Sequence, residues 1–322
     1  MFEKTFAVSI HRDNDLVPFT FYLIFMREQL KKYYADKKLF WRALIVAIFV
    51  FVVIFQVSGN KRSVNIGASS ELSFAGEVMP TDGKYQLNIE RFDREIALLE
   101  INAAQFIMIY KRWNLIIPTI EKELKKAGLP DDLKYIPVIE SALRENVSSS
   151  AGAAGIWQFM PWTARNYGLV VNEFVDERFD VAKSTAAAIR YFQDLGKQFD
   201  KWTLSAAAYN RGENGLQKSM DSQYNNNFYD LWLTTETSRY VFRLLATKYV
   251  REHKYNFFDR DSLGSMYTPI KTKKLNVKQI DDLADRARKN GFGYYEVKKL
   301  NPWILKNSLP DGQWTIQVAE EK

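Results

Sequence analysis

The apolar segment at residues 39–57 most constrains how this chain can fold. It reads LFWRALIVAIFVFVVIFQV and has no polar side chain between Ala43 and Phe55. Its length is close to that needed to cross a bilayer, and it offers no polar face for the surface of a soluble domain. Arg42 is close enough to one end to extend into the lipid headgroups. The segment is therefore predicted to be a transmembrane helix.

Basic residues lie mainly on the N-terminal side of this segment. Only Lys61 and Arg62 follow it closely, whereas the upstream side carries Arg27, Lys31, Lys32, Lys37 and Lys38. Positive charge favours the cytoplasmic side of a membrane. Residues 1–38 are therefore predicted to be cytoplasmic and residues 60–322 to lie on the other side.

The sequence leaves open whether this segment stays attached. An uncleaved signal anchor is favoured, because the apolar run is long for the core of a signal peptide. The alternative is a signal peptide cleaved near Gly59, after the small residues that follow Val57. Cleavage fits better if translation begins at Met26, because the basic residues then form a short N-terminal region.

Composition excludes several classes of function. The 322 residues are 47% hydrophobic, which is enough for one sizeable core and a small second domain. The absence of cysteine excludes disulfides, thiolate catalysis, cysteine-ligated zinc and a lipid-bearing cysteine. Neither of the two histidines, His11 and His253, lies near a nucleophile motif, so a Ser-His-Asp triad is not expected. Most of the net charge of +7 flanks the apolar segment, so no nucleic-acid partner is predicted.

Beyond the membrane segment, residues 58–86 are rich in small polar residues and are predicted to be a flexible linker. Residues 87–255 then show helical periodicity, for example at Phe92 and Ile96. No series of strands is expected in this region. The sequence therefore predicts a mainly α domain here.

The C-terminal residues 266–322 differ from this pattern. Strands are predicted at Tyr267–Lys271 and Trp314–Ala319, with helices at Val277–Lys289 and Tyr295–Leu300 between them. This order of strand, helix, helix and strand predicts a small α+β module.

Glu140 is the first candidate for chemistry. It lies in the mostly apolar stretch YIPVIESA at residues 135–142, where Pro137 is expected to kink or interrupt the helix. Apolar surroundings raise the pKa of a carboxyl group, and a raised pKa suits a general acid near neutral pH. A solvated glutamate on a helix surface would show the same local sequence, so the downstream motifs decide between the two.

Two downstream segments favour a cleft for a polymer. Residues 148–155, SSSAGAAG, form a small-residue loop that lets a ligand approach the backbone, and the next residues, IWQFMPWTA, supply large apolar walls. Residues 204–212, LSAAAYNRG, place a Tyr-Asn pair just before a glycine break. Sugar-binding sites commonly combine apolar faces with a few polar groups in this way.

Together these motifs identify a family resemblance. They occur in the order Glu140-Ser141, then Gly152-x-x-Gly155-x-Trp157-Gln158-Phe159-Met160-Pro161-x-Thr163-Ala164, then Ala208-Tyr209-Asn210-x-Gly212. Over residues 88–252 the chain resembles the soluble-lytic-transglycosylase-like catalytic domain, glycoside hydrolase family 23. Within that family it is most similar to the membrane-bound lytic murein transglycosylase D branch. Phe242 stands where this branch usually has proline, and the branch's lipid-bearing cysteine is absent.

The resemblance implies a lysozyme-like, goose-type fold and cleavage of the bond between N-acetylmuramic acid and N-acetylglucosamine in peptidoglycan. It implies that Glu140 acts first as general acid and then as base, giving a 1,6-anhydromuramoyl end. Residues that orient this glutamate or bind glycan would be Ser141, Gln158, Met160, Tyr209, Asn210 and Tyr240. No metal or other cofactor is implied, and a monomer is expected. The protein would work in the cell envelope, anchored in the inner membrane with its catalytic domain in the periplasm, or exported after cleavage.

Residues 266–322 resemble a LysM glycan-binding module, most clearly at Leu300-Asn301-Pro302. The alternative is a packing extension of the catalytic domain.

Two further functions remain open. One is a hydrolytic muramidase of the same fold, and the other is a non-catalytic peptidoglycan-binding or scaffold protein. Ordinary retaining glycosidases need a second carboxylate as nucleophile, but Asp176, Glu177 and Asp180 are read as structural or solvent-facing.

Overall fold

The computed structural model describes residues 24–29, 41, 44–48 and 72–320, and it divides into two units, residues 1–65 and 66–322. Among the described residues, no helix is both long enough and apolar enough to cross a membrane. Most of the predicted span at residues 39–57, and the predicted cleavage site at Gly59, lie outside the described residues.

The N-terminal part of the second unit is a folded hairpin. Strands β1 (Ser73–Phe74) and β2 (Glu77–Val78) pair antiparallel, and the Phe74 side chain is fully buried. The Glu77 carboxylate accepts hydrogen bonds from the Trp202 and Thr203 amides at the start of another helix. The prediction of a linker over residues 58–86 is therefore wrong from residue 72 onward. Small residues form the tight turn of this hairpin, and long-range contacts of Phe74 and Glu77 hold it, so the segment has no periodicity to detect.

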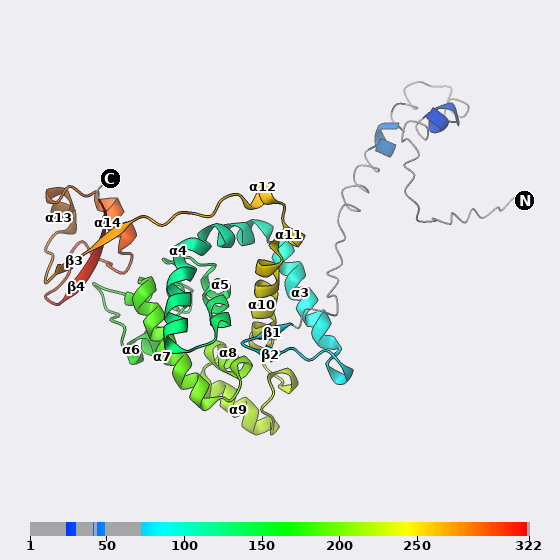
Figure 1. Cartoon of the computed structure of the whole chain (residues 1–322), viewed down its shortest axis with the longest axis horizontal. Coiled ribbons are helices and arrows are strands. Elements are labelled where there is room, and N and C mark those ends of the chain that lie inside the picture. The colour runs from blue at the N-terminus through cyan, green and yellow to red at the C-terminus, as the bar shows by residue number, and fades with distance from the viewer. Residues whose placement is uncertain (1–23, 30–40, 42–43, 49–71, 321–322) are drawn as a thin grey trace, which may run out of the picture. The chain divides into compact units, whose positions relative to one another are not determined.

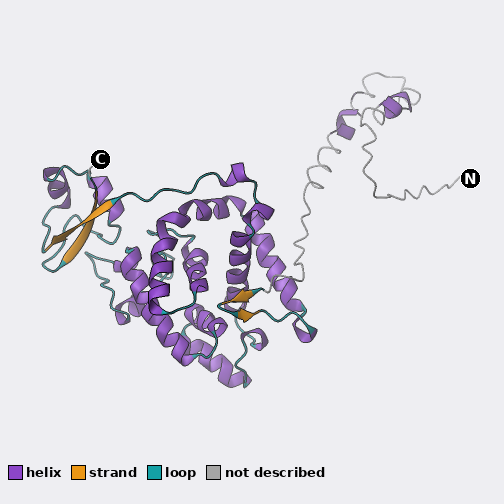
Figure 2. Cartoon of the chain, viewed as in Figure 1, coloured by secondary structure: helices purple, strands orange, loops and turns teal. Residues whose placement is uncertain are grey.

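Residues 83–263 are mainly helical, as predicted, and this part dominates Figure 2. The helices are α3 (Leu87–Ile101), α4 (Ala103–Ala127), α5 (Tyr135–Ser141), α6 (Pro161–Asn166), α7 (Val181–Gln198), α8 (Trp202–Arg211), α9 (Glu213–Gln223), α10 (Thr235–Glu252), α11 (Lys254–Phe257) and α12 (Arg260–Leu263). Short 3-10 turns lie at Gly83–Tyr85, Asp131–Lys134, Glu177–Phe179 and Phe228–Asp230.

Helix α10 organises the core. It packs against α3, α5 and α8 (Figure 1). Its Val241, Leu244 and Leu245 side chains are buried. The helix starts after Thr234, whose hydroxyl accepts a hydrogen bond from the Thr237 amide. Phe242, which replaces the branch's usual proline, lies well inside the helix and is fully buried. The start of α10 is thus set by its threonine cap.

The C-terminal module has the predicted order of elements but shifted boundaries. Strand β3 (Thr272–Val277) pairs antiparallel with β4 (Trp314–Ala319), and α13 (Leu283–Lys289) and α14 (Tyr294–Leu300) lie between them in the chain. The first strand therefore starts after the predicted Tyr267–Lys271. The first helix is shorter than predicted, because Val277 ends the strand and Asp282 caps the helix by accepting from the Asp285 amide.

A segment of the helical domain completes the core of this module. Val175 is fully buried in the same apolar cluster as Trp303, Ile304 and Val318. The backbone bonds are Asp176 N to the Trp303 carbonyl, 2.9 Å, and Leu305 N to the Phe174 carbonyl, 2.8 Å. The module is therefore packed onto the helical domain through residues 174–176.

Candidate active site

Helix α5 ends immediately after Glu140. Pro137 occupies its first turn, where a missing amide hydrogen costs little, so the expected kink at Pro137 is not observed. Ala142 and Leu143 have positive φ angles of 53° and 57°, which stop the helix. Glu140 is consequently held on the last turn of a short, largely buried helix.

The Glu140 carboxyl group is desolvated and held by one strong hydrogen bond. The Tyr240 hydroxyl donates to Oε1 of Glu140 at 2.5 Å. Burial raises the pKa of Glu140, although the Tyr240 hydrogen bond and the charge of Arg243 oppose this effect, and Glu236 adds to it. A glutamate with a raised pKa keeps its proton at higher pH, so it can act as a general acid.

Glu140 lines a cleft of about 730 Å³. Four of the other predicted site residues also line it: Gln158, Met160, Tyr209 and Asn210. The structure thus brings five of the seven predicted residues to one cleft.

The small-residue loop forms one wall of this cleft. Gln158 has a positive φ of 49° and its side-chain amide donates to the Gly155 carbonyl at 2.8 Å, which turns the chain back on itself. Met160 follows at the start of α6 and is 44% exposed. Together these residues place a polar amide beside an apolar surface on this wall of the cleft.

Tyr209 and Asn210 close the opposite side. The Tyr209 hydroxyl donates to the Trp157 carbonyl at 2.5 Å, which ties α8 to the loop. The Asn210 amide donates to Glu236 at 3.0 Å, and its oxygen accepts from Thr237 at 2.8 Å. Asn210 therefore joins the end of α8 to the start of α10 while it lines the cleft.

Ser141 and Tyr240 lie behind the cleft. The Ser141 side chain is buried, and its hydroxyl donates to the Pro137 carbonyl at 2.8 Å within the same helix. Tyr240 is only 1% exposed and contacts Glu140 from below the cleft surface. These positions fit residues that orient the glutamate rather than residues that touch a ligand.

The three acidic residues considered as second carboxylates do not line the cleft and make structural contacts elsewhere. Asp176 pairs with Arg178 at 2.6 Å, Glu177 pairs with Lys183, and Asp180 caps α7 through the Lys183 amide. The expectation that these residues are structural agrees with these contacts.

Sequence reasoning did not select several residues of the cleft as site residues. Glu213 accepts a hydrogen bond from the Tyr191 hydroxyl at 2.8 Å, and Glu236 accepts from Asn210, so two further carboxylates line the cleft. Trp162 also lines it and is 69% exposed, unusually high for so large an apolar side chain. Trp162 stood out in the sequence only as part of an aromatic stretch, and such stretches are more often buried core.

Among the residues that the structure describes, no group of three or more His, Asp and Glu side chains is arranged to hold a metal ion.

Comparison with known proteins identifies the domains. Residues 118–231 match the Transglycosylase SLT domain family, and residues 273–322 match the Soluble lytic transglycosylase C-terminal LysM-like domain family. The central part of the helical domain, residues 118–231, is therefore similar to transglycosylase SLT domains. This confirms the family predicted from the motifs, and the second match confirms the LysM-like character of the C-terminal module.

Relatives of the SLT domain agree with this assignment. The chain is 42% identical over 195 residues to membrane-bound lytic murein transglycosylase D of Escherichia coli strain K12. That match covers 59% of this chain and 43% of the relative, so the chain spans less than half the length of this curated protein.

Solved structures with some likeness include lytic transglycosylase Slt of Pseudomonas aeruginosa, with 23% identity and a TM-score of 0.36. Another is the 70 kDa soluble lytic transglycosylase of Escherichia coli, with 21% identity and a TM-score of 0.37. Each likeness covers 47% of this chain and 26% of the other.

Proposed function

We propose that this protein is a lytic transglycosylase that cleaves the N-acetylmuramic acid–N-acetylglucosamine bond of peptidoglycan. The observation that carries the proposal is the setting of Glu140: a desolvated carboxyl group, bonded to Tyr240, at the base of a cleft in an SLT domain. The 42% identity to a murein transglycosylase supports the same substrate.

The proposed reaction uses one carboxyl group twice. Protonated Glu140 gives its proton to the glycosidic oxygen as the bond from that oxygen to C1 of the muramoyl sugar breaks. The muramoyl N-acetyl group stabilises the positive charge at C1. The resulting Glu140 carboxylate takes the proton from the sugar's 6-hydroxyl as O6 bonds to C1, which yields the 1,6-anhydro product without consuming water.

The other proposed site residues divide by position. Gln158, Met160 and Tyr209 offer an amide, an apolar surface and an aromatic ring to the glycan, because they line the cleft beside Glu140. Asn210 holds the cleft's walls together, while Ser141 and Tyr240 support the Glu140 helix and side chain.

The mass of the products tests the reaction type. Isolated sacculi are digested with the purified chain, and the released muropeptides are analysed by mass spectrometry. Anhydro ends, one water lighter than hydrolysed ends, are expected. Reducing ends alone would instead establish a hydrolase, and an absence of released fragments would favour a glycan-binding protein without activity.

Hydrolysis is the second candidate, because Glu213 and Glu236 line the same cleft as Glu140. A hydrolase could use one of these carboxylates to activate water. Digestion in ¹⁸O-labelled water separates the two functions, since only hydrolysis places the label on the muramoyl end.

Trp162 is proposed as a stacking surface for a sugar ring, because this indole is exposed inside the cleft. Replacing it by alanine, Trp162→Ala, is expected to raise KM for glycan by about tenfold, since loss of an aromatic contact costs about 1 kcal/mol or more. The change in kcat should be small. Trp232→Ala is the matched control, because Trp232 is 88% exposed and lies outside the cleft lining. Equal effects of the two variants on KM would contradict the role of Trp162.

The proposed organisation is a cytoplasmic segment at 1–38, an anchor at 39–57, a catalytic domain that includes 87–255 and a glycan-binding module at 266–322, acting as a monomer in the cell envelope. The Escherichia coli relative is named a membrane-bound lytic murein transglycosylase, which supports a membrane location. The full chain should sediment with inner membranes and resist extraction by carbonate, whereas replacing Ala47 and Ile48 by aspartate should release it. A chain found only in the soluble periplasmic fraction, and shortened by its N-terminal part, would indicate cleavage near Gly59.

A further inference from the structure

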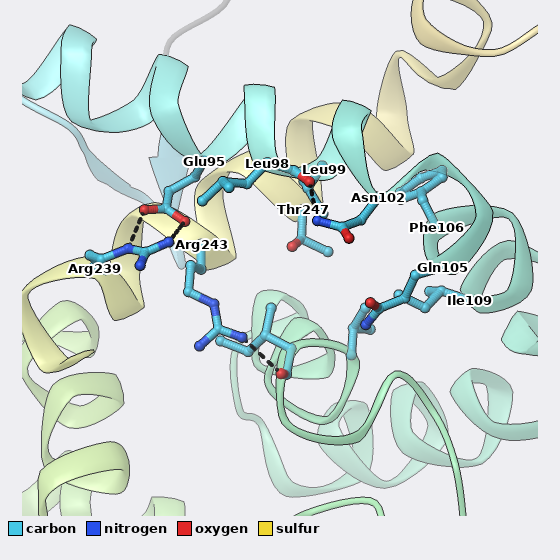
Figure 3. A pocket seen from close by; sticks show the side chains of 12 residues that line it. Glu95, Leu98, Leu99, Asn102, Gln105, Phe106, Ile109, Arg239, Arg243 and Thr247 are labelled. Carbon is cyan, nitrogen blue, oxygen red and sulfur yellow. Dashed lines mark hydrogen bonds and ion pairs between the residues drawn. The ribbon is translucent and has the colours of Figure 1, made fainter. Parts of the chain in front are cut away.

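A small cavity lies beside α5, and Glu140 is not among the residues that line it. It has a volume of about 210 Å³ and is lined by residues of α3, α4, α5 and α10 (Figure 3). Val138 and Ile139 of α5 line this cavity, whereas Glu140 lines the catalytic cleft. The backbone that carries Glu140 is thus the partition between the two spaces.

Arg243 reaches this partition from α10. Its guanidinium donates to the Ile139 carbonyl at 3.0 Å, next to Glu140 in the chain (Figure 3). Tyr240 lies three residues earlier on the same helix, so both side chains project from one face of α10. One contacts the carboxylate of Glu140 and the other contacts the backbone immediately before it.

The charge of Arg243 is not neutralised locally. Within residues 72–320, no carboxylate forms an ion pair with Arg243. Arg239, one turn earlier, also lines the cavity, but it makes two hydrogen bonds to the buried Glu95 at 2.7 and 2.9 Å (Figure 3). The two arginines therefore lie on the same helix and line the same cavity. The charge of Arg239 is neutralised by Glu95, whereas the charge of Arg243 is not neutralised by an ion pair within the described residues.

We propose, on the basis of the proposed function, that Arg243 is a positioning residue for Glu140. It fixes the last turn of α5 through the Ile139 carbonyl and places an unpaired positive charge behind the catalytic carboxylate. Such a charge stabilises the carboxylate that remains after Glu140 has given up its proton.

Other groups act on the same carboxyl group. Tyr240 and Glu236 face it from α10, Tyr209 faces it from α8, and Glu213 lines the same cleft. Two further arginines hold the end of α5: Arg112 donates to the Ala142 carbonyl and Arg144 to the Ser141 carbonyl. Arg243 and Glu236 act in opposite directions on the pKa of Glu140, which makes them a matched pair for an experiment.

The test is a ¹³C NMR titration of the Glu140 carboxyl group in the purified full chain, with Glu140→Gln used to assign the signal. In Arg243→Gln the Glu140 signal should titrate at higher pH than in the wild type, and in Glu236→Gln at lower pH. The double variant Arg239→Gln/Glu95→Gln removes both charges of that ion pair and should leave it unchanged. Arg243→Lys keeps the charge and should titrate close to the wild type.

Turnover gives the second measurement. Arg243→Gln should lower kcat by about 10- to 100-fold with little change in KM, since small displacements of a catalytic group cost this much. In this variant the fall of kcat at basic pH should begin at a higher pH than in the wild type, because Glu140 keeps its proton to higher pH. An unchanged Glu140 titration in Arg243→Gln, or an equal shift in Arg239→Gln/Glu95→Gln, would overturn the proposal. The titration needs no substrate, so this failure is distinct from a failure to find anhydro products.

Discussion

Replacing Glu140 by glutamine is expected to reduce release of muropeptides by at least about 10³-fold. Glutamine keeps the shape of the side chain and can accept the hydrogen bond from Tyr240, but it cannot give or take a proton. Thermal unfolding should occur at the wild-type temperature or above it, because a neutral amide is less costly to bury than a carboxylate. The measurement is mass spectrometry of products from sacculi, combined with sedimentation of the sacculi to measure binding.

The control for this variant is Glu145→Gln. Glu145 lies five residues further along, and burial raises its pKa as it does for Glu140, but it does not line the catalytic cleft. Activity should remain close to that of the wild type. Wild-type activity in Glu140→Gln, or equal losses in both variants, would show that Glu140 is not the acid of the reaction.

Replacing Gly155 by alanine is expected to destabilise the protein by about 4 kcal/mol and to lower its Tm by about 10 °C. Gly155 has a φ of +76°, and a β-carbon there would lie 1.8 Å from the Arg178 carbonyl oxygen. That oxygen belongs to the backbone, so the clash requires the cleft loop or the Arg178 segment to move. Activity should fall as well, because the same loop carries Gln158 into the cleft.

Gly152→Ala is the matched control on the same loop. Gly152 has a φ of +91°, but nothing lies within 4 Å of a β-carbon placed there. Only the backbone strain remains, and it costs about 1–2 kcal/mol. Calorimetry of the two variants separates the effects, and equal losses of stability would contradict the close contact at Gly155.

The large effect at Gly155 is expected because this loop is held from several sides. The Arg178 guanidinium donates to the Gly152 and Phe159 carbonyls at 2.7 and 2.9 Å, and it is buried against Asp176. The backbone amide of Asp176 in turn bonds to Trp303 of the LysM-like module. The buried Asp176–Arg178 ion pair therefore connects the cleft loop to the C-terminal module.

The sequence alone indicated the family, the helical class of the main domain and Glu140 as the candidate acid. These depend on local features, because a helix shows its buried face as periodicity and the three motifs keep their order in the chain. The predicted boundary between linker and folded domain was wrong, because the sequence has no local pattern that marks the hairpin. The hairpin at residues 72–79 is held by Phe74 and by Glu77 capping α8, and both contacts join segments far apart in the chain.

Only the tertiary structure decided which residues surround Glu140. Glu213, Glu236 and Trp162 line its cleft, whereas Ser141 turns its hydroxyl back into α5. Arg243 and Tyr240 reach Glu140 from a helix about a hundred residues away in the chain. Distance and desolvation govern the pKa of a carboxyl group, and both are set by long-range packing. The sequence therefore supplied the candidate acid, and the packing of α5 against α10 supplied the buried environment that raises its pKa.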